Sequence, residues 1–396
     1  MKAVLLFLVV CACACSVNPY SGVPEKYHTL IEQALSKAGE NRTELEKALL
    51  EAPKKEKEGM AFLIAYMPDR DLQELSAAFL LENTEYAYKA REKYSWARAL
   101  PDSIFLNEVL PYVSLNETRE NWRKDFYERF GQYVDTCHNL QEAIEAVNRH
   151  IRDEVGVDYN TLREKPDQAP FESIRQQMAS CTGLSILLTD AFRAVGIPSR
   201  VAGTPNWHDG RGNHNWTEVW MDGKWFFTEY YFPGQLDQAW FFADAGQASK
   251  DDPQKAIYAS SFRPTGISFP LVWDRNIQYV PAENVTERYN ELYASHLSAI
   301  TTGGNHVPVR VSMFATNQCT RTSDSRVAVN VDVFCGKMQM GGGRTSGPLQ
   351  DMNDVLTFML EKNKTYTICY TDGKDQAKRV EVQVETQPKD VNLYMQ

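Results

Sequence analysis

The segment NHNWTEVWMDGKWFFTEYY, residues 213–231, constrains the fold more than any other part of the sequence. Two runs of aromatic and β-branched residues flank Asp222-Gly223, and this dipeptide favours a two-residue type I′ turn. We therefore predict a β-hairpin in which the numbers of facing residues sum to 445. In that register Trp216 faces Glu229.

Strand alternation places His214 and Glu229 on the same face of the predicted hairpin. As diagonal neighbours they should have Cα atoms about 7 to 8 Å apart, a gap that the two side chains can close with a hydrogen bond. Glu218 shares this face but lies opposite Phe227, further along. The large aromatic residues of the face favour a partly buried polar pair with shifted pKa values. The alternative is an exposed cross-strand pair, because a hairpin often has one solvated side.

A second feature is a helix predicted to begin at Cys181, in the segment 180–196. Ser180 is a typical N-cap residue, apolar residues follow at helical spacing, and Gly196 is placed to end the helix. The N–H groups and partial positive charge of a helix start stabilise a thiolate and an oxyanion. Cys181 is therefore a candidate nucleophile, and a small buried cysteine at a helix end is the alternative.

The two features complement each other chemically. A cysteine nucleophile needs a base that takes its proton and a third group that orients the base. His214 and Glu229 supply those two groups.

The order of these elements resembles the core of the transglutaminase-like (transglutaminase/protease) superfamily. The segments CTGLSILLTDAFRAVGIPSRVAG and HNWTEVWMDGKWFFTEYY carry the resemblance. It implies a papain-like core, in which a helix packs on an antiparallel sheet, and a triad of Cys181 as nucleophile, His214 as base and Glu229 as orienting acid. Glu229 departs from the aspartate that is usual in the family. The oxyanion donor beyond the Cys181 N–H stays unassigned, although Gln176 and Gln177 precede the cysteine.

The predicted fold class is α+β, with this core between two flanking regions. Helical spacing predicts a helical N-terminal region over residues 20–138 and leads into the catalytic core at 139–280. A helical linker at 281–304 ends in glycines. Short alternating runs separated by turn residues then predict an antiparallel, Ig-like β-sandwich over 305–396.

The N-terminus reads as an export signal. Residues 1–15 hold one lysine, an apolar run and then small residues beside cysteines, which resembles a lipobox that ends at Cys15 or Cys13. The order of this signal, a helical region, the core and a β-sandwich resembles exported transglutaminase-like lipoproteins of Bacteroidetes-type bacteria. The resemblance implies a bacterial cell-envelope lipoprotein that faces the periplasm or the cell surface and touches the membrane only through its lipid anchor. An ordinary cleaved signal without a lipid is the alternative.

Charge and cysteine usage exclude several classes of function. The formal net charge is −10 with no basic run, so nucleic acid is not an expected partner. No cofactor is expected, and no metal, because the cysteines and histidines lack zinc-ligand spacing. A metal site built from His208, Asp209 and His214 is a weaker alternative. Of the cysteines beyond residue 15, one pair among Cys319, Cys335 and Cys369 could form a disulfide.

The leading prediction is a cysteine-dependent acyl-transfer enzyme that hydrolyses amide bonds of a peptide, protein or glycan-peptide substrate through a thioester. Trp207 and Trp216 could line its substrate groove, although tryptophans of this region also suit a hydrophobic core. The alternative function is a catalytically degraded binding or scaffold lipoprotein of the same fold.

Overall fold

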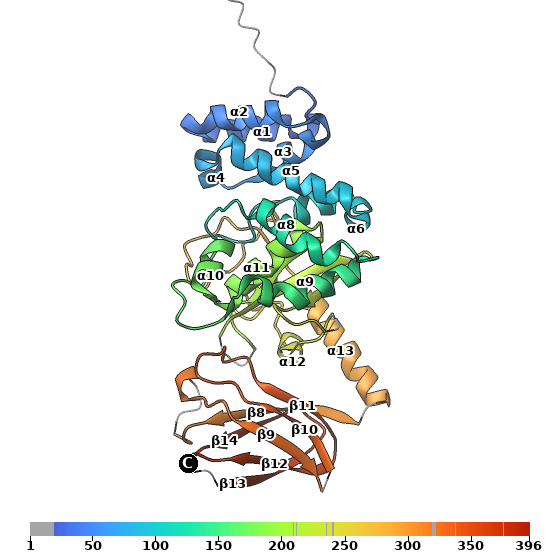
Figure 1. Cartoon of the computed structure of the whole chain (residues 1–396), viewed down its shortest axis with the longest axis vertical. Helices are drawn as coiled ribbons and strands as arrows, with labels where there is room; N and C mark the ends of the chain where they lie inside the picture. The colour runs from blue at the N-terminus through green and yellow to red at the C-terminus, as the bar shows by residue number, and fades with distance from the viewer. Residues whose placement is uncertain are drawn as a thin grey trace, which may run out of the picture. The chain divides into compact units, whose positions relative to one another are not determined.

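The computed structural model of the chain (Figure 1) describes residues 20–396 apart from 209, 211, 235, 240, 304, 319–321, 337 and 375. The predicted signal with Cys13 and Cys15 lies outside the described residues, as do Asp209 and Cys319. No helix within the described ranges is long and apolar enough to cross a membrane. The predictions of export and lipidation are therefore not tested by the structure.

The chain divides into two compact units, residues 1–81 and 82–396. The described part of the first unit is helical and contains α1 (His28–Lys37), α2 (Arg42–Glu51), α3 (Lys57–Tyr66) and α4 (Asp69–Glu74). Its core is formed by fully buried aliphatic side chains that recur at helical spacing, among them Ile31, Leu35, Leu45, Leu49, Leu63 and Ile64. Helix α5 (Ala77–Lys93) runs across the boundary between the units.

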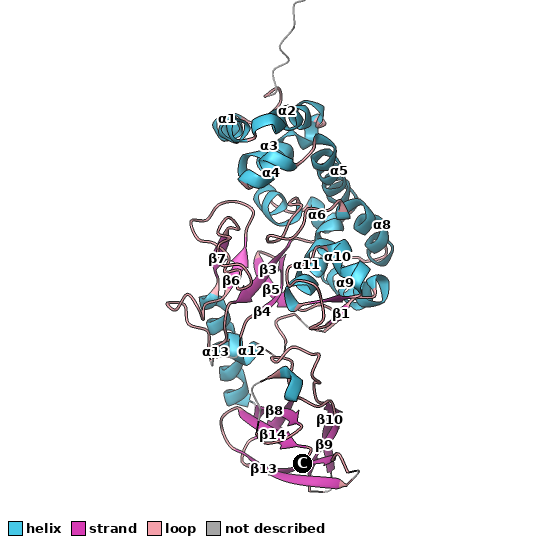
Figure 2. Ribbon diagram, turned by 90° about the vertical axis from the view of Figure 1, so that its left-hand side faces the viewer, coloured by secondary structure: helices cyan, strands magenta, loops and turns pink. Residues whose placement is uncertain are grey.

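The second unit contains the mixed helical and sheet core that the hairpin and cysteine helix predicted. An antiparallel five-stranded sheet has the order β5-β4-β3-β6-β7. Its strands are β3 (Ser199–Thr204), β4 (His214–Met221), β5 (Lys224–Thr228), β6 (Tyr258–Ser260) and β7 (Ala282–Asn284). The helices of this core are α8 (Trp122–Val134), α9 (Leu140–Val155), α10 (Pro170–Gln176) and α11 (Cys181–Ala194). Figure 2 shows these helices on one side of the sheet. The predicted α+β class is confirmed.

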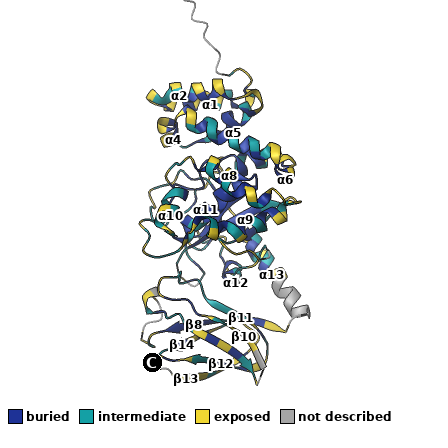
Figure 3. Ribbon diagram, in the orientation of Figure 1, coloured by how far each residue is buried: buried dark blue, intermediate teal, exposed yellow. Residues whose placement is uncertain are grey.

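Helix α11 is the centre of the core. Of its residues beyond Cys181, all but Leu184 are buried (Figure 3). It packs against β3 and β4 on one side and against α8 and α9 on the other. Aromatic side chains such as Phe126 and Phe130 fill the space between these helices. Because α11 has almost no contact with water, its position relative to β4 is set by packing.

The hairpin has the predicted register. Strands β4 and β5 pair from Thr217 with Thr228 to Met221 with Lys224, so that facing numbers sum to 445. Asp222 and Gly223 both have positive φ angles, of 52° and 81°, as a type I′ turn requires.

The C-terminal part of the second unit is a β-sandwich that closes on one apolar core. One sheet joins β9 (Asn330–Cys335), β10 (Met338–Arg344), β12 (Lys364–Thr371) and β13 (Ala377–Val384). The other joins β8 (His306–Phe314), β11 (Leu356–Glu361) and β14 (Lys389–Tyr394). Helix α13 (Thr286–Gly303) precedes them, and α12 (Phe242–Ala245) belongs to the core.

Two features of the sandwich differ from the sequence prediction. Strand β14 pairs in parallel with β8, so the sheets are not wholly antiparallel. Strand β10 is not one of the alternating runs on which the sandwich was predicted, because its GlyGlyGly run lacks the β-branched and aromatic residues that are typical of strands. Cys335 and Cys369 are free thiols, so no disulfide joins them.

Close packing of β3 on β4 generates a stability prediction. A Cβ added at Gly203 would lie 2.7 Å from the carbonyl oxygen of His214 and would overlap the side-chain oxygen of Asn215. We expect Gly203→Ala to destabilise the chain by about 1 to 3 kcal/mol because neither neighbour has room to move. The midpoint of thermal unfolding, followed by circular dichroism, measures this.

Gly131→Ala is the matched control because it adds the same methyl group inside α8, 3.4 Å from the Tyr94 hydroxyl. We expect this variant to be neutral or stabilised, since alanine exceeds glycine in helix propensity by about 1 kcal/mol. Equal midpoints for the two variants would contradict the close approach of β3 to β4.

Candidate active site

Cys181 is the first residue of α11, as predicted. The Ser180 side chain caps the helix by accepting a hydrogen bond from the Gly183 N–H at 3.1 Å. The Ser180 hydroxyl donates in turn to the carbonyl oxygen of Pro166. Cys181 is partly exposed, while the residues that follow it are mostly buried. The thiol therefore lies where helix N–H groups have no acceptor within the helix and can stabilise a negative charge.

A hydrogen bond between polar side chains joins the start of α11 to the start of β4. The Asn215 amide donates to the Thr182 hydroxyl at 2.7 Å, and both residues are buried. Each is the immediate neighbour of a candidate catalytic residue, Cys181 on the helix and His214 on the strand. This buried bond restricts movement of the thiol relative to the imidazole.

His214 and Glu229 form the hydrogen bond that the hairpin register predicted. The Nε2 atom of His214 lies 2.8 Å from Oε1 of Glu229. The imidazole is 4% exposed and packs among the rings of Trp207, Trp216 and Phe241. The alternative of a solvent-exposed cross-strand pair is therefore wrong.

The backbone of Glu229 is held by a residue that sequence reasoning did not single out. Asn148 of α9 donates to the Glu229 carbonyl oxygen at 2.8 Å and to the Thr228 hydroxyl at 2.9 Å. Its own side-chain oxygen accepts from the Phe232 N–H. Asn148 is buried, so α9 fixes the chain where β5 ends and the acid begins.

Electrostatics favour a protonated His214. Burial by itself lowers the pKa of the imidazole, but hydrogen bonds to Cys181 and Glu229 outweigh it and hold that pKa well above its usual value. An imidazolium next to a sulfur stabilises the thiolate form of the cysteine. The positive charge that His214 favours therefore lies beside the Cys181 sulfur.

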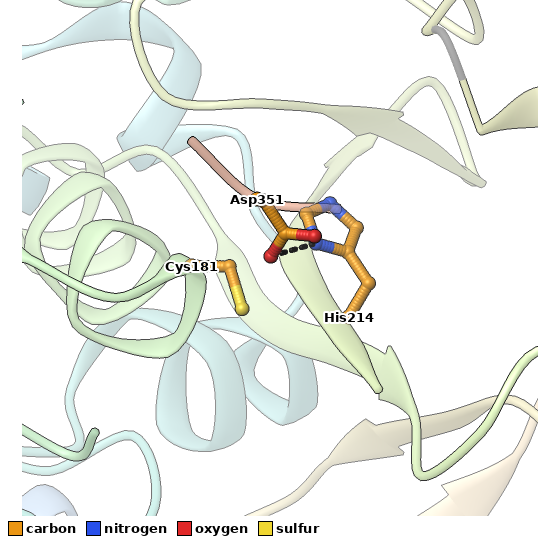
Figure 4. A group of neighbouring side chains, drawn as sticks. All are labelled: Cys181, His214 and Asp351. Atoms are coloured by element: carbon orange, nitrogen blue, oxygen red, sulfur yellow. Dashed lines mark ion pairs between the residues drawn. The ribbon is translucent and has the colours of Figure 1, made fainter. Parts of the chain in front are cut away.

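Asp351 of the β10–β11 loop also reaches this site, which the sequence did not predict. Three atoms lie within 4.8 Å of one another: a ring nitrogen of His214, a carboxylate oxygen of Asp351 and the sulfur of Cys181 (Figure 4). Nδ1 of His214 is 4.0 Å from Oδ2 of Asp351. Asp351 is far from Cys181 and His214 in the sequence and lies in a loop without a recognisable motif, so no local pattern could have identified it.

The Asp351 loop is held by several hydrogen bonds. Arg326, which is buried, donates to the carbonyl oxygens of Asp351 and Asp354. The Asn353 N–H donates to Oδ1 of Asp351 at 2.8 Å, and the Asn353 side-chain amide donates to the carbonyl oxygen of Asn213, which precedes His214. The Asp351 carboxylate is thus positioned by its own loop and by contact with the core.

Tyr159 lies beside the same group. Burial first, and then the nearby Asp351 and Cys181, raise the pKa of its phenol. The hydroxyl therefore keeps its proton and can act as a hydrogen-bond donor.

Glu218, the other acid on this face of the hairpin, has a structural role. Its fully buried carboxylate accepts a hydrogen bond from Arg200 at 2.9 Å and also pairs with Arg288. Burial by itself raises the pKa of Glu218, but Arg288 and Arg200 outweigh it and hold the pKa below its usual value. Glu218 is displaced from His214, in agreement with the register.

The two tryptophans predicted to bind substrate lie beneath the site. Trp207 and Trp216 are each 1% exposed and stack on one another with ring centroids 6.0 Å apart. They pack against the imidazole and leave little surface for a ligand, so a role in substrate binding stays a prediction.

Other residues raised by the sequence lie in different environments. Gln176, which is partly exposed, exchanges hydrogen bonds with Glu164. Gln177 is an exposed residue with a positive φ of 55°. His208 lies 3.4 Å from Asp244. Neither Gln176 nor Gln177 is therefore assigned as a second oxyanion donor.

A cavity of about 1240 Å³ opens over the thiol. Its wall on the core side includes Tyr159, Cys181, His214, Glu229, Phe232 and Tyr293. Its wall on the sandwich side includes Pro308, Asp351, Leu356 and Met359. A volume of this size is sufficient for a short peptide or another ligand of comparable size.

Cys181, His214 and Asp351 are also the residues within the described ranges whose atoms could converge on a metal ion. Thiolate, imidazole and carboxylate are all zinc ligands, and a carboxylate on the second imidazole nitrogen is a common outer partner of such a site. The same three side chains can therefore serve nucleophilic chemistry or hold a cation.

Comparisons with known proteins find a similarity over part of the chain. Residues 128–230 match the family model of the transglutaminase-like superfamily, and this range includes Cys181, His214 and Glu229 but not Asp351. No curated protein matches the chain. A crystal structure of a "Putative Cysteine Protease" from Cytophaga hutchinsonii matches at 17% identity and a TM-score of 0.26, over 48% of this chain and 58% of that one. A likeness of that strength decides nothing about the site.

The hydrogen bond to Glu229 generates a prediction about His214. Glu229→Gln keeps the shape of the side chain but removes its negative charge, so we expect the pKa of His214 to fall. NMR titration of selectively labelled histidine measures the change. Glu287→Gln is the control because Glu287 is exposed and pairs with Lys250.

The same variant changes how stability depends on pH. A pKa raised by folding contributes stability fully below the unfolded value of about 6.5 and loses it as pH rises through the folded value. The native chain should therefore exceed Glu229→Gln in thermal midpoint most at about pH 6, and less in alkaline solution. A difference that grows with pH would contradict a raised pKa.

Proposed function

We propose that the chain, in which residues 128–230 match the transglutaminase-like superfamily, is a cysteine-dependent enzyme that transfers the acyl group of an amide through a triad of Cys181, His214 and Glu229. One observation carries the proposal. A helix-start thiol lies next to an imidazole whose second nitrogen is bound to a carboxylate at 2.8 Å. Nucleophile, base and orienting acid are then in the order that thiol acyl transfer requires.

In the first half of the proposed reaction, the Cys181 sulfur attacks the carbonyl carbon of the amide. An S–C bond forms, and the carbonyl electrons move onto oxygen. The N–H groups at the start of α11 favour the oxyanion. As the C–N bond breaks, His214 gives its proton to the departing amine, which leaves a thioester.

In the second half, His214 is a base. It takes a proton from water while the oxygen attacks the thioester carbonyl, and the S–C bond then breaks to release the acid and restore the thiolate. An amine in place of water would give a new amide. Glu229 keeps the imidazole oriented and stabilises its charged form in both halves.

The proposed substrate is a peptide, a protein or a glycan-linked peptide. The cavity over the thiol supports this choice because it combines apolar side chains with a few polar groups near the sulfur. We propose hydrolysis as the main outcome, since water can reach the partly exposed thiol through the cavity.

Alkylation of the thiol tests the triad without a known substrate. We expect iodoacetamide to alkylate Cys181 faster than it alkylates the thiol of free glutathione near neutral pH, since an imidazolium favours the thiolate. Cys137 of the same chain is an internal comparison, because burial and then Glu142 raise the pKa of its thiol. Peptide mass spectrometry measures both rates. His214→Gln should slow Cys181 at least about tenfold and leave Cys137 unchanged.

Alkylation of Cys181 that is no faster than that of glutathione, both in the native chain and in His214→Gln, would favour the alternative of a binding or scaffold protein. Turnover is then tested on a mixture of casein peptides with a fluorescent primary amine present. New peptide ends indicate hydrolysis, and attached fluorophore indicates transfer. Cys181→Ala should abolish both.

Chelation distinguishes thiol chemistry from a metal site. Attack by a thiolate needs no Lewis acid, so we expect EDTA to leave the rate of Cys181 alkylation and the release of peptides unchanged. A thiol that becomes reactive only after EDTA treatment would show that a metal held by Cys181, His214 and Asp351 had masked it.

A further inference from the structure

We propose that Asp351 determines substrate specificity by binding the free α-ammonium group of the residue whose carbonyl Cys181 attacks. The chain would then act on the amino-terminal residue of its substrate. This inference rests on the proposed function, because it specifies which amides the Cys181 site accepts.

The position of the Asp351 carboxylate is the first argument. It faces the cavity beside the nucleophile, with one oxygen within 4.8 Å of the Cys181 sulfur and 4.0 Å from Nδ1 of His214. Its side chain is only 15% exposed. Such a charge is weakly screened by water and acts strongly on the groups that react next to it.

The charge itself is the second argument. A carboxylate beside the thiol disfavours both the thiolate and the oxyanion of the intermediate, because all three are negative. Nε2 of His214 is already bound to Glu229 at 2.8 Å. A positive group on the substrate would offset the repulsion, so a cationic substrate is favoured over a neutral one at this position.

Reach identifies which cation fits. In a reactive complex the carbonyl carbon lies about 3 to 3.5 Å from the sulfur. The α-nitrogen of the same residue is two bonds of about 1.5 Å from that carbon. It therefore lies within about 6 Å of the sulfur, where a carboxylate oxygen at 4.8 Å or less can accept its hydrogen bond. An ammonium one residue further along would lie about 3.5 Å beyond it.

The loop that carries Asp351 is built to hold this position. Arg326 binds the carbonyl oxygens on both sides of the turn, and Gln350 links the Gly347 N–H to the Asp354 carboxylate. Asn353 is 2% exposed and contacts the backbone of Asn213. A carboxylate held in this way loses little freedom when an ammonium binds it, which favours tight recognition.

A pair of covalent probes tests the inference. Alanine chloromethyl ketone carries a free α-ammonium, and its N-acetyl derivative does not. In both, the Cys181 sulfur displaces chloride from the methylene carbon, so intact-mass spectrometry gives the rate of labelling. We expect the native chain to react with the free-ammonium probe about tenfold faster or more, after correction by the ratio measured with glutathione.

The variant Asp351→Asn keeps the size of the side chain and removes its charge. We expect the ratio of the two rates to fall to about that of glutathione. Asp158→Asn is the matched control: Asp158 lines the same cavity, but its carboxylate pairs with Arg152. This control should keep the native ratio. Because each ratio is taken within one protein sample, partial misfolding of a variant does not imitate the result.

The outcomes separate this inference from the proposed function. If neither probe labels Cys181 faster than glutathione, the proposed function fails. If both label it rapidly with equal corrected rates, or if Asp351→Asn keeps the native ratio, the function stands and the role of Asp351 is wrong. Faster labelling by the acetylated probe would also overturn it.

Discussion

The register of the β4–β5 hairpin is the constraint on which the site depends. A slip of one residue would exchange the faces of the strand for every side chain. In the observed register His214 meets Glu229, and Asn215 meets Thr182 on α11. The turn at Asp222 and Gly223 therefore controls the orientation of the imidazole, while packing of α11 on β4 sets its distance from the thiol.

Two carboxylates lie on opposite sides of this imidazole, and they differ in origin. Glu229 comes from the paired strand and binds Nε2, so it belongs to the same local unit as the base. Asp351 comes from the sandwich and approaches Nδ1, where the thiol also lies. The first stabilises a charged imidazole without opposing the sulfur. The second places a carboxylate from the sandwich in the wall of the cavity over the thiol, which is the basis of the substrate specificity that we propose.

The sequence predicted the parts of the site that depend on nearby residues. The position of Cys181 at a helix start was predicted from an N-cap residue and the helical spacing of apolar residues. The pairing of His214 with Glu229 was predicted from the residues of the turn. Asn148 and Asp351 were missed because an asparagine inside a helix and an aspartate in a loop have no pattern of their own. The parallel pairing of β14 with β8 was missed for a related reason, since alternation does not specify which strand will be the neighbour.

By itself the sequence determined the α+β class, the helix that begins at Cys181 and the face of the hairpin that carries His214 and Glu229. These depend on dihedral preferences and periodicity within about 20 residues, which short segments encode directly. Only the tertiary structure decided that Asn148 holds the end of β5, that two tryptophans are buried beneath His214 and that Asp351 enters the site. Those contacts join segments far apart in the chain, and packing of the whole unit selects them.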